Sequence, residues 1–220
     1  NDPALYGALI QVEASEESPL AMFNGLSFEL LYKKISDETG MFRISFIMPE
    51  RFRRFELGII TIMLGQIIVE IYTNGSFLVD FGFPHQDDYG KSFGLEFYIF
   101  TGKGGVYFGA FKGDAAKSVP QIVNGAFTPV LLLGIGLRVG LGRSFDLGIV
   151  KAGVALELFG IFEGVLAFFK PDEESVRQNP EVKEAVYYRV RAKAGIMGCL
   201  FLSVDLKIIT LNVTAEIMVW

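Results

Sequence analysis

The chain has 220 residues, enough for one large β domain or two small ones. It is 51% hydrophobic and only 20% charged, and its 25 glycines are not counted in the hydrophobic percentage. The net charge of −5 argues against a broad basic surface, and therefore against nucleic acid as a partner, while a single cysteine cannot build an internal disulfide framework.

The N-terminus has no charged segment followed by a short apolar run. Because the first residue is Asn1, we expect a processed chain or an excised fragment. The apolar runs 57–69 and 127–137 are interrupted by glycine and are shorter than the roughly 18 residues of a membrane helix. The longer run 152–169 is broken by Glu157 and Glu163. No helical membrane span is predicted.

The first half of the sequence predicts β-hairpins. Segments 25–34 and 41–49 are expected to pair around a turn at 36–40. The segment 57–72 is apolar at both odd and even positions, which predicts one strand, bulged at Gly65 and buried on both faces.

Two further hairpins follow. The sequence "TNGS" at 73–76 predicts a type I′ turn, with 77–84 as the returning strand. Segments 93–100 and 105–111 are then expected to pair around "TGKG" at 101–104.

"VLLLGIGLRVGLG" at 130–142 alternates large apolar residues with glycine, so one side of this strand is mostly bare backbone. We expect another backbone to approach closely there. Residues 141–148 are predicted to turn, and 149–169 to form the next strand.

The C-terminal part combines a charged excursion with a long alternating segment. Residues 170–185 form a charged loop or a short helix, which is a candidate inserted loop. In 186–220 the alternation changes phase at Ile208-Ile209, which predicts a β-bulge or a crossing between two sheets. Because it then runs on to Trp220, we expect the native polypeptide or its sheet to continue further.

Together these patterns predict an all-β fold with many antiparallel strands, arranged as a sandwich, a bent sheet or a barrel-like sheet. Much of that sheet is expected to be apolar on both faces. We expect a single domain over 1–220 that is a piece of a larger assembly.

Three segments resemble parts of very large, uncharacterised β-rich bacterial proteins: Tyr72–Pro84, Lys91–Gly109 and Phe159–Phe169. The resemblance implies that the chain belongs to a larger assembly. It implies no activity and transfers no functional residue.

The sequence predicts no catalytic, cofactor or metal site, and therefore no enzyme. It has one histidine, one cysteine and no nucleophile elbow. "HQDD" at 85–88 is interpreted as a polar turn rather than a cation site. The glycines of 134–140 lack both the spacing and the following helix of a dinucleotide-binding loop.

Three functions remain, and the preferred one is a non-catalytic structural or assembly module that associates through apolar sheet faces and strand edges. The alternative is a groove or tunnel that binds or conducts lipid-like ligands. The second alternative is a membrane-inserted β-barrel, placed last because strands apolar at both parities indicate a dry interior. Self-association or contact with neighbouring segments of a larger protein is expected, lipid is a possible partner, and a secreted or cell-envelope location is favoured.

Two sets of residues are candidates for binding. The first, an apolar ligand or packing wall, comprises Phe97, Ile99, Phe108, Leu133, Ile135, Leu137, Phe159 and Phe162. The second is an anion-binding stripe of Arg189, Arg191 and Lys193, which share one side of a predicted strand.

Overall fold

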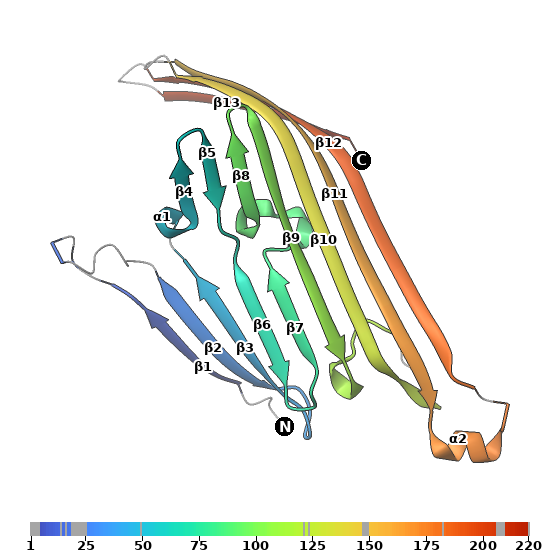
Figure 1. Ribbon diagram of the computed structural model, residues 1–220. Helices are drawn as coiled ribbons and strands as arrows, with labels where there is room; N and C mark the ends of the chain where they lie inside the picture. The colour runs from blue at the N-terminus through green and yellow to red at the C-terminus, as the bar shows by residue number, and fades with distance from the viewer. Residues whose placement is uncertain are drawn as a thin grey trace.

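The computed structural model describes residues 5–13, 15, 17–18, 26–48, 50–120, 122, 124–146, 150–181, 183–205 and 210–219. Their strands form one 13-stranded antiparallel sheet (Figure 1). The strands are β1 (Leu5–Gln11), β2 (Ser27–Lys34), β3 (Gly40–Ile47), β4 (Arg54–Leu57), β5 (Ile60–Met63), β6 (Ile67–Tyr72), β7 (Phe77–Phe81), β8 (Phe93–Phe97), β9 (Phe100–Phe111), β10 (Gly125–Asp146), β11 (Val150–Pro171), β12 (Ala185–Asp205) and β13 (Thr210–Val219).

Most strands follow one path across the sheet, in the order β1-β2-β3-β6-β7-β9-β10-β11-β12-β13. A branch of β4, β5 and β8 joins this path where β8 pairs with β9. The path ends at β1 and β13, and the described sheet stays open. The helical segments are short: α1 (Glu50–Arg53), α2 (Glu173–Gln178), and the 3-10 turns η2 (His85–Asp87), η3 (Tyr89–Lys91) and η4 (Gly113–Ala115).

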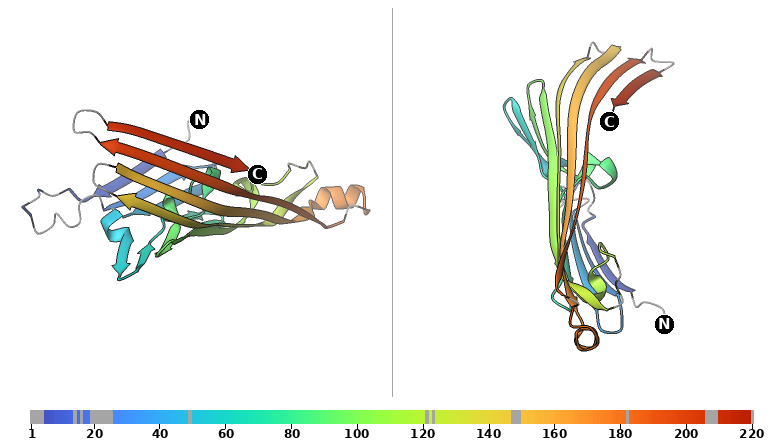
Figure 2. Two further views of the ribbon diagram at one scale, coloured as in Figure 1. Left: turned by 90° about the horizontal axis from the view of Figure 1, so that it is seen from above. Right: turned by 90° about the vertical axis from the view of Figure 1, so that its right-hand side faces the viewer.

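The sheet is bent along its width. In the right-hand view of Figure 2, β1 and the C-terminal strands lean to the same side as the 3-10 turns, while the middle strands bulge the other way. The sheet therefore has a hollow, concave face and a convex face.

The predicted fold class is confirmed, and the bent sheet is the variant that forms. Strands β2 and β3 pair as expected. Within the charged segment 170–185, α2 begins at an Asp172 side chain that accepts a hydrogen bond from the Ser175 amide. This bond holds the pKa of Asp172 below its usual value.

One strand prediction is wrong because an apolar run was taken as one strand. The segment 57–72 contains β5 and β6, separated by residues 64–66, and they pair with different neighbours. Its side chains are mostly half-buried rather than buried on both faces. The phase change predicted at Ile208-Ile209 lies outside the described residues, and the strands on either side of it, β12 and β13, pair antiparallel.

Three turns also differ from expectation. The 73–76 hairpin forms between β6 and β7, but only Gly75 has a positive φ, of 80°, so the turn is not type I′. "TGKG" lies inside β9, and the chain turns earlier, at Tyr98 with φ of 56°. Strand β10 continues through the predicted turn at 141–148 as far as Asp146.

Two buried clusters lie on the concave side. One joins Phe83 and Tyr89, from the segment that carries η2 and η3, with Phe159 and Ile161 of β11. The other lies near the opposite end of β10 and β11, and comprises Phe111, Ala115, Phe127, Val130, Val165, Ala167 and Phe169.

The glycine side of β10 is the concave side, and other parts of this chain cover it. A Cβ on Gly136 would lie 2.2 Å from Pro84 Cγ, and one on Gly134 would lie 2.1 Å from Tyr107 Cε1. Other groups do approach the glycines closely, as expected. They are a proline ring and an aromatic ring, however, and not the neighbouring backbone that was predicted.

The substitution Gly136→Ala is expected to lower the free energy of unfolding by about 1–3 kcal/mol, because its methyl group overlaps Pro84. Gly198→Ala is a matched control, since a Cβ there meets nothing within 4 Å. Urea unfolding of both variants measures the difference. Equal stabilities would show that the segment at Pro84 does not rest on β10.

Candidate functional site: an apolar convex face and a charged concave face

Strand alternation divides the sheet into two chemically different faces. On β10 the convex side carries Leu131, Leu133, Ile135, Leu137, Val139 and Leu141, each 38–59% exposed. The concave side of the same strand carries Val130, Leu132, Gly134, Gly136, Arg138 and Gly140. The large apolar residues thus face outward, while glycine and arginine face the hollow.

The same division holds across the sheet, because directly paired residues share a face. Three rows of paired residues run from β1 to β12 on the convex side. The first row is Tyr6, Tyr32, Phe42, Ile71, Phe77, Ala110, Leu131, Leu166 and Tyr188. The second row is Ala8, Leu30, Ile44, Val69, Val79, Phe108, Leu133, Gly164 and Val190. The third row is Ile10, Phe28, Phe46, Ile67, Phe81, Val106, Ile135, Phe162 and Ala192. None of these described residues is charged.

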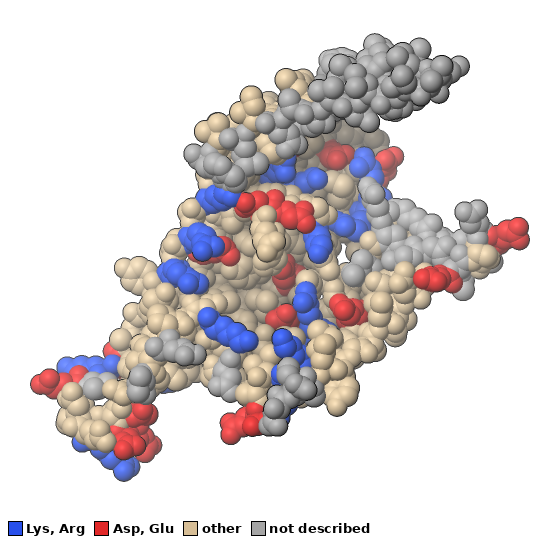
Figure 3. Space-filling model, turned by 180° about the vertical axis from the view of Figure 1, so that it is seen from behind, with Lys and Arg blue, Asp and Glu red and all other residues tan. Residues whose placement is uncertain are grey.

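Charged residues gather on the concave face (Figure 3). By register these include Glu29, Lys33, Arg43, Glu70, Asp80, Lys103, Arg138, Glu157, Glu163, Arg189, Arg191 and Lys193. They alternate with the apolar convex residues on strands β2 to β12, which is typical of a sheet with one wet face.

Many of these charges are paired with one another. Arg138 Nε donates to Glu157 Oε2 at 2.6 Å. Arg191 lies 3.6 Å from Glu163, whose other oxygen accepts a hydrogen bond from the Tyr107 hydroxyl at 3.2 Å. The sequence around Glu157 and Glu163 did not indicate these cationic partners, because Arg138 and Arg191 lie on the two strands next to β11.

The segment 83–92, which we call the inner loop, folds over the concave face. The Tyr89 hydroxyl donates to Leu137 O at 3.1 Å, and the Arg138 guanidinium lies 5.6 Å from the Tyr89 ring centre. Asp87 forms an ion pair with Lys193 of β12. Gln86 has a positive φ of 56°, a conformation that costs free energy and that these contacts offset.

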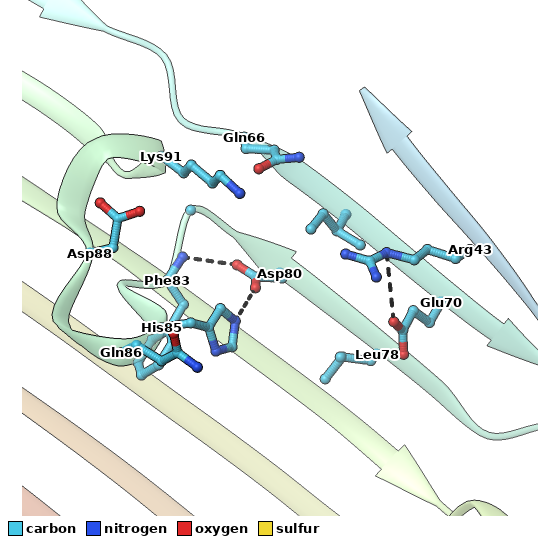
Figure 4. A pocket seen from close by; sticks show the side chains of 12 residues that line it. Arg43, Gln66, Glu70, Leu78, Asp80, Phe83, His85, Gln86, Asp88 and Lys91 are labelled. Atoms are coloured by element: carbon cyan, nitrogen blue, oxygen red, sulfur yellow. Dashed lines mark hydrogen bonds and ion pairs between the residues drawn. The ribbon is translucent and has the colours of Figure 1, made fainter. Parts of the chain in front are cut away.

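Beside the inner loop, a cavity of about 470 Å³ opens on the concave face (Figure 4). Strands β3, β6 and β7 provide Arg43, Glu70 and Asp80, and the inner loop provides His85 and Lys91. His85 Nε2 lies 2.5 Å from Asp80 Oδ2. Sequence analysis did not identify this cavity, because its walls come from segments far apart in the chain.

The structure divides the predicted apolar wall. Phe97, Phe108, Leu133, Ile135, Leu137 and Phe162 lie together on the exposed convex face. Phe159 is on the concave face, 9% exposed, in the cluster beneath the inner loop. Ile99 lies in the turn between β8 and β9, where its carbonyl accepts a hydrogen bond from the Gly142 amide.

The predicted anion-binding stripe does share one side of a strand. Arg189, Arg191 and Lys193 follow one another on the concave side of β12. Arg191 and Lys193 are engaged with Glu163 and Asp87, respectively.

The "HQDD" residues do not converge on one point. Asp87 forms an ion pair with Lys193, whereas Asp88 accepts a hydrogen bond from the Gly90 amide. Over the described ranges, no group of three His, Cys, Asp or Glu side chains could hold a metal ion.

No family model matches the chain, and neither a curated protein nor a solved structure shows detectable similarity to it. The resemblance to large bacterial β-rich proteins therefore stays a prediction. In the part of the chain that the structure describes, no helix has the length and apolar character to cross a bilayer.

Burial of the Tyr89 side chain between the inner loop and the sheet raises the pKa of Tyr89 to about 12 from its usual value of 10.0. A raised pKa means that the folded state holds the phenol proton more tightly than the unfolded state does. The resulting stabilisation is present below pH 10 and is lost as the pH rises through about 12.

Burial also raises the pKa of Tyr107 to about 12 and raises that of Tyr72. We therefore expect a pH titration of phenolate absorbance to show several late-ionising tyrosines, and Tyr89→Phe to reduce this late step by one tyrosine. The exposed Tyr98 supplies the control variant, Tyr98→Phe, which is expected to leave the late step at its full size. A smaller late step in the control, with none lost in Tyr89→Phe, would show that Tyr89 is not shielded by the inner loop.

Proposed function

We propose that this chain forms part of the wall of a membrane-inserted β-barrel, with its convex face against lipid acyl chains and its concave face toward water. The observation that carries the proposal is the segregation of charge. Three rows of convex residues across nine strands are uncharged, while the concave side of all of these strands except β1 carries arginine, lysine, aspartate or glutamate. Membrane β-barrels have this apolar-out, polar-in alternation.

The length of the apolar run is compatible with a bilayer. From Leu131 to Leu141 on β10 the run extends about 33 Å at 3.3 Å per residue. A strand tilt of about 40° reduces this to about 25 Å along the membrane normal, which is the height of the apolar band of such proteins. Strands β10 and β11, with 22 residues each, are long enough to extend beyond that band.

The area of the convex face also favours contact with a continuous apolar solvent such as lipid acyl chains. The three rows alone cover nine strands spaced about 4.8 Å apart and about 20 Å along each strand, so they present on the order of 1,000 Å². The largest apolar patch of a typical soluble monomer is roughly 300–600 Å². At about 25 cal/mol per Å², removing this face from water is worth on the order of 25 kcal/mol.

Aromatic side chains mark both ends of the apolar run. Tyr6, Tyr32 and Phe42 lie side by side on β1, β2 and β3, with ring centres 6.3 and 4.9 Å apart. At the opposite end, Phe97 and Tyr98 stand at the turn between β8 and β9. Aromatic girdles at the two lipid–water boundaries are typical of membrane β-sheets.

Lipid accounts for the convex face better than the other two candidates do. A protein partner that covered it would be expected to bring hydrogen bonds, at about one per 100–200 Å² of interface, yet the three rows offer only tyrosine hydroxyls. A groove for lipid-like ligands would need an apolar concave wall, and the concave face is the charged one. The assembly function is retained at the strand edges, because β1 and β13 need partner strands in a bilayer.

Fluorescence quenching by lipids brominated in their acyl chains tests the proposal. The single tryptophan is first replaced by Trp220→Phe. Leu137→Trp then places a probe on the convex face, and Lys103→Trp places one on the concave face one residue away in register. In vesicles of brominated phosphatidylcholine, the probe at 137 is expected to be strongly quenched and the probe at 103 much less so.

Two results would overturn the membrane proposal. One is equal quenching of both probes, and the other is failure of the folded chain to associate with vesicles. A folded chain that forms lipid-free oligomers, and that shields the probe at 137 from a water-soluble quencher, would instead favour a protein partner on the convex face.

The cost of a charge on the convex face should depend on depth. Leu137→Arg, near the middle of the apolar run, is expected to lower the stability of the inserted protein by about 2–4 kcal/mol. Tyr188→Arg, near the end of β12, is expected to cost about 0–1 kcal/mol. Urea unfolding from vesicles measures both values. A soluble interface would give no such ordering by depth.

A further inference from the structure

The cavity beside the inner loop has an unusual balance of hydrogen-bonding groups. Its carboxylates are already engaged. Asp80 Oδ1 accepts from the Phe83 amide at 2.8 Å, and its other oxygen faces His85. Glu70 Oε2 accepts from the Tyr72 hydroxyl at 2.9 Å.

The cationic side chains of this cavity have fewer hydrogen-bond partners than its carboxylates do. Arg43 Nε forms a long ion pair with Glu70 Oε1 at 3.9 Å, but this nitrogen is buried and has no hydrogen-bond partner among the described residues. Leaving a buried donor unsatisfied costs about 1–3 kcal/mol. The Lys91 ammonium likewise has no hydrogen bond or ion pair with any described residue. Figure 4 shows Arg43 and Lys91 reaching into the cavity from different walls, with Asp80 between them.

We propose that this cavity binds the carboxylate group of a small polar solute, with Arg43 and Lys91 as its donors. A planar carboxylate matches the planar guanidinium fork. The volume of about 470 Å³ lies within the range of small-molecule sites.

The charges around the cavity select among anions. Glu70, Asp80 and Asp88 line the same space as Arg43 and Lys91. Their field disfavours a dianion, so a monoanionic carboxylate is preferred over phosphate. All of these groups lie on the concave face, so binding there does not depend on what covers the convex face.

The test uses the full chain folded in detergent micelles, with acetate as the probe and acetamide as an uncharged probe of similar shape. NMR of the arginine Nε–H groups reports on Arg43 directly, and Arg43→Lys assigns its resonance. Acetate is expected to shift that resonance saturably, while acetamide leaves it in place and phosphate binds more weakly.

Lys91→Gln is expected to weaken acetate binding about tenfold, because a hydrogen bond to a charged group is lost. Lys103→Gln removes a charge elsewhere on the concave face and is expected to leave the affinity unchanged. The far-UV circular dichroism spectrum confirms that each variant is folded. The proposal is overturned if acetate gives no saturable shift, if acetamide acts equally, or if both lysine variants bind like the parent chain. None of these outcomes bears on lipid quenching at Leu137.

Discussion

The structure depends on one constraint, which is that strand alternation stays in phase from β1 to β12. Because paired residues share a face, the three apolar rows continue across nine strands on the convex side, while most charges of these strands lie on the concave side. Removing the convex face from water is worth on the order of 25 kcal/mol, which exceeds the roughly 5–15 kcal/mol of a whole domain. The environment of this face therefore decides whether the sheet is stable at all.

On the concave face, polar groups must find hydrogen-bond and ion-pair partners without a second sheet packed against them. Glycines on β10 leave room for Tyr107 and Pro84 to lie close against the strand. The inner loop then covers part of the sheet, and its Asp87 reaches the basic side of β12. Ion pairs such as Arg138 with Glu157 link neighbouring strands. Glycine thus allows a single sheet to carry a small core of its own.

Local patterns predicted the strands and hairpins, while contacts between distant segments determined the site. The alternation in 130–142 and the charged helix at 173–178 were both visible in the sequence. Phe159 and Phe162 were assigned to one wall, although residues three apart in a strand face opposite sides. The Arg43 cavity joins β3, β6, β7 and the inner loop, so no local pattern could reveal it. Apolar residues at both parities concealed the break between β5 and β6.

The proposed membrane function and the expected assembly function both require partners at the edges of the sheet. In the described part of the chain, β1 pairs only with β2, and β13 only with β12. Each free edge presents backbone N–H and C=O groups, which cost several kcal/mol each if they face hydrocarbon. A bilayer can therefore accept the convex face only if other strands pair with both edges. Lipid would cover the face and partner strands would cover the edges, so lipid contact and assembly become two requirements of one structure.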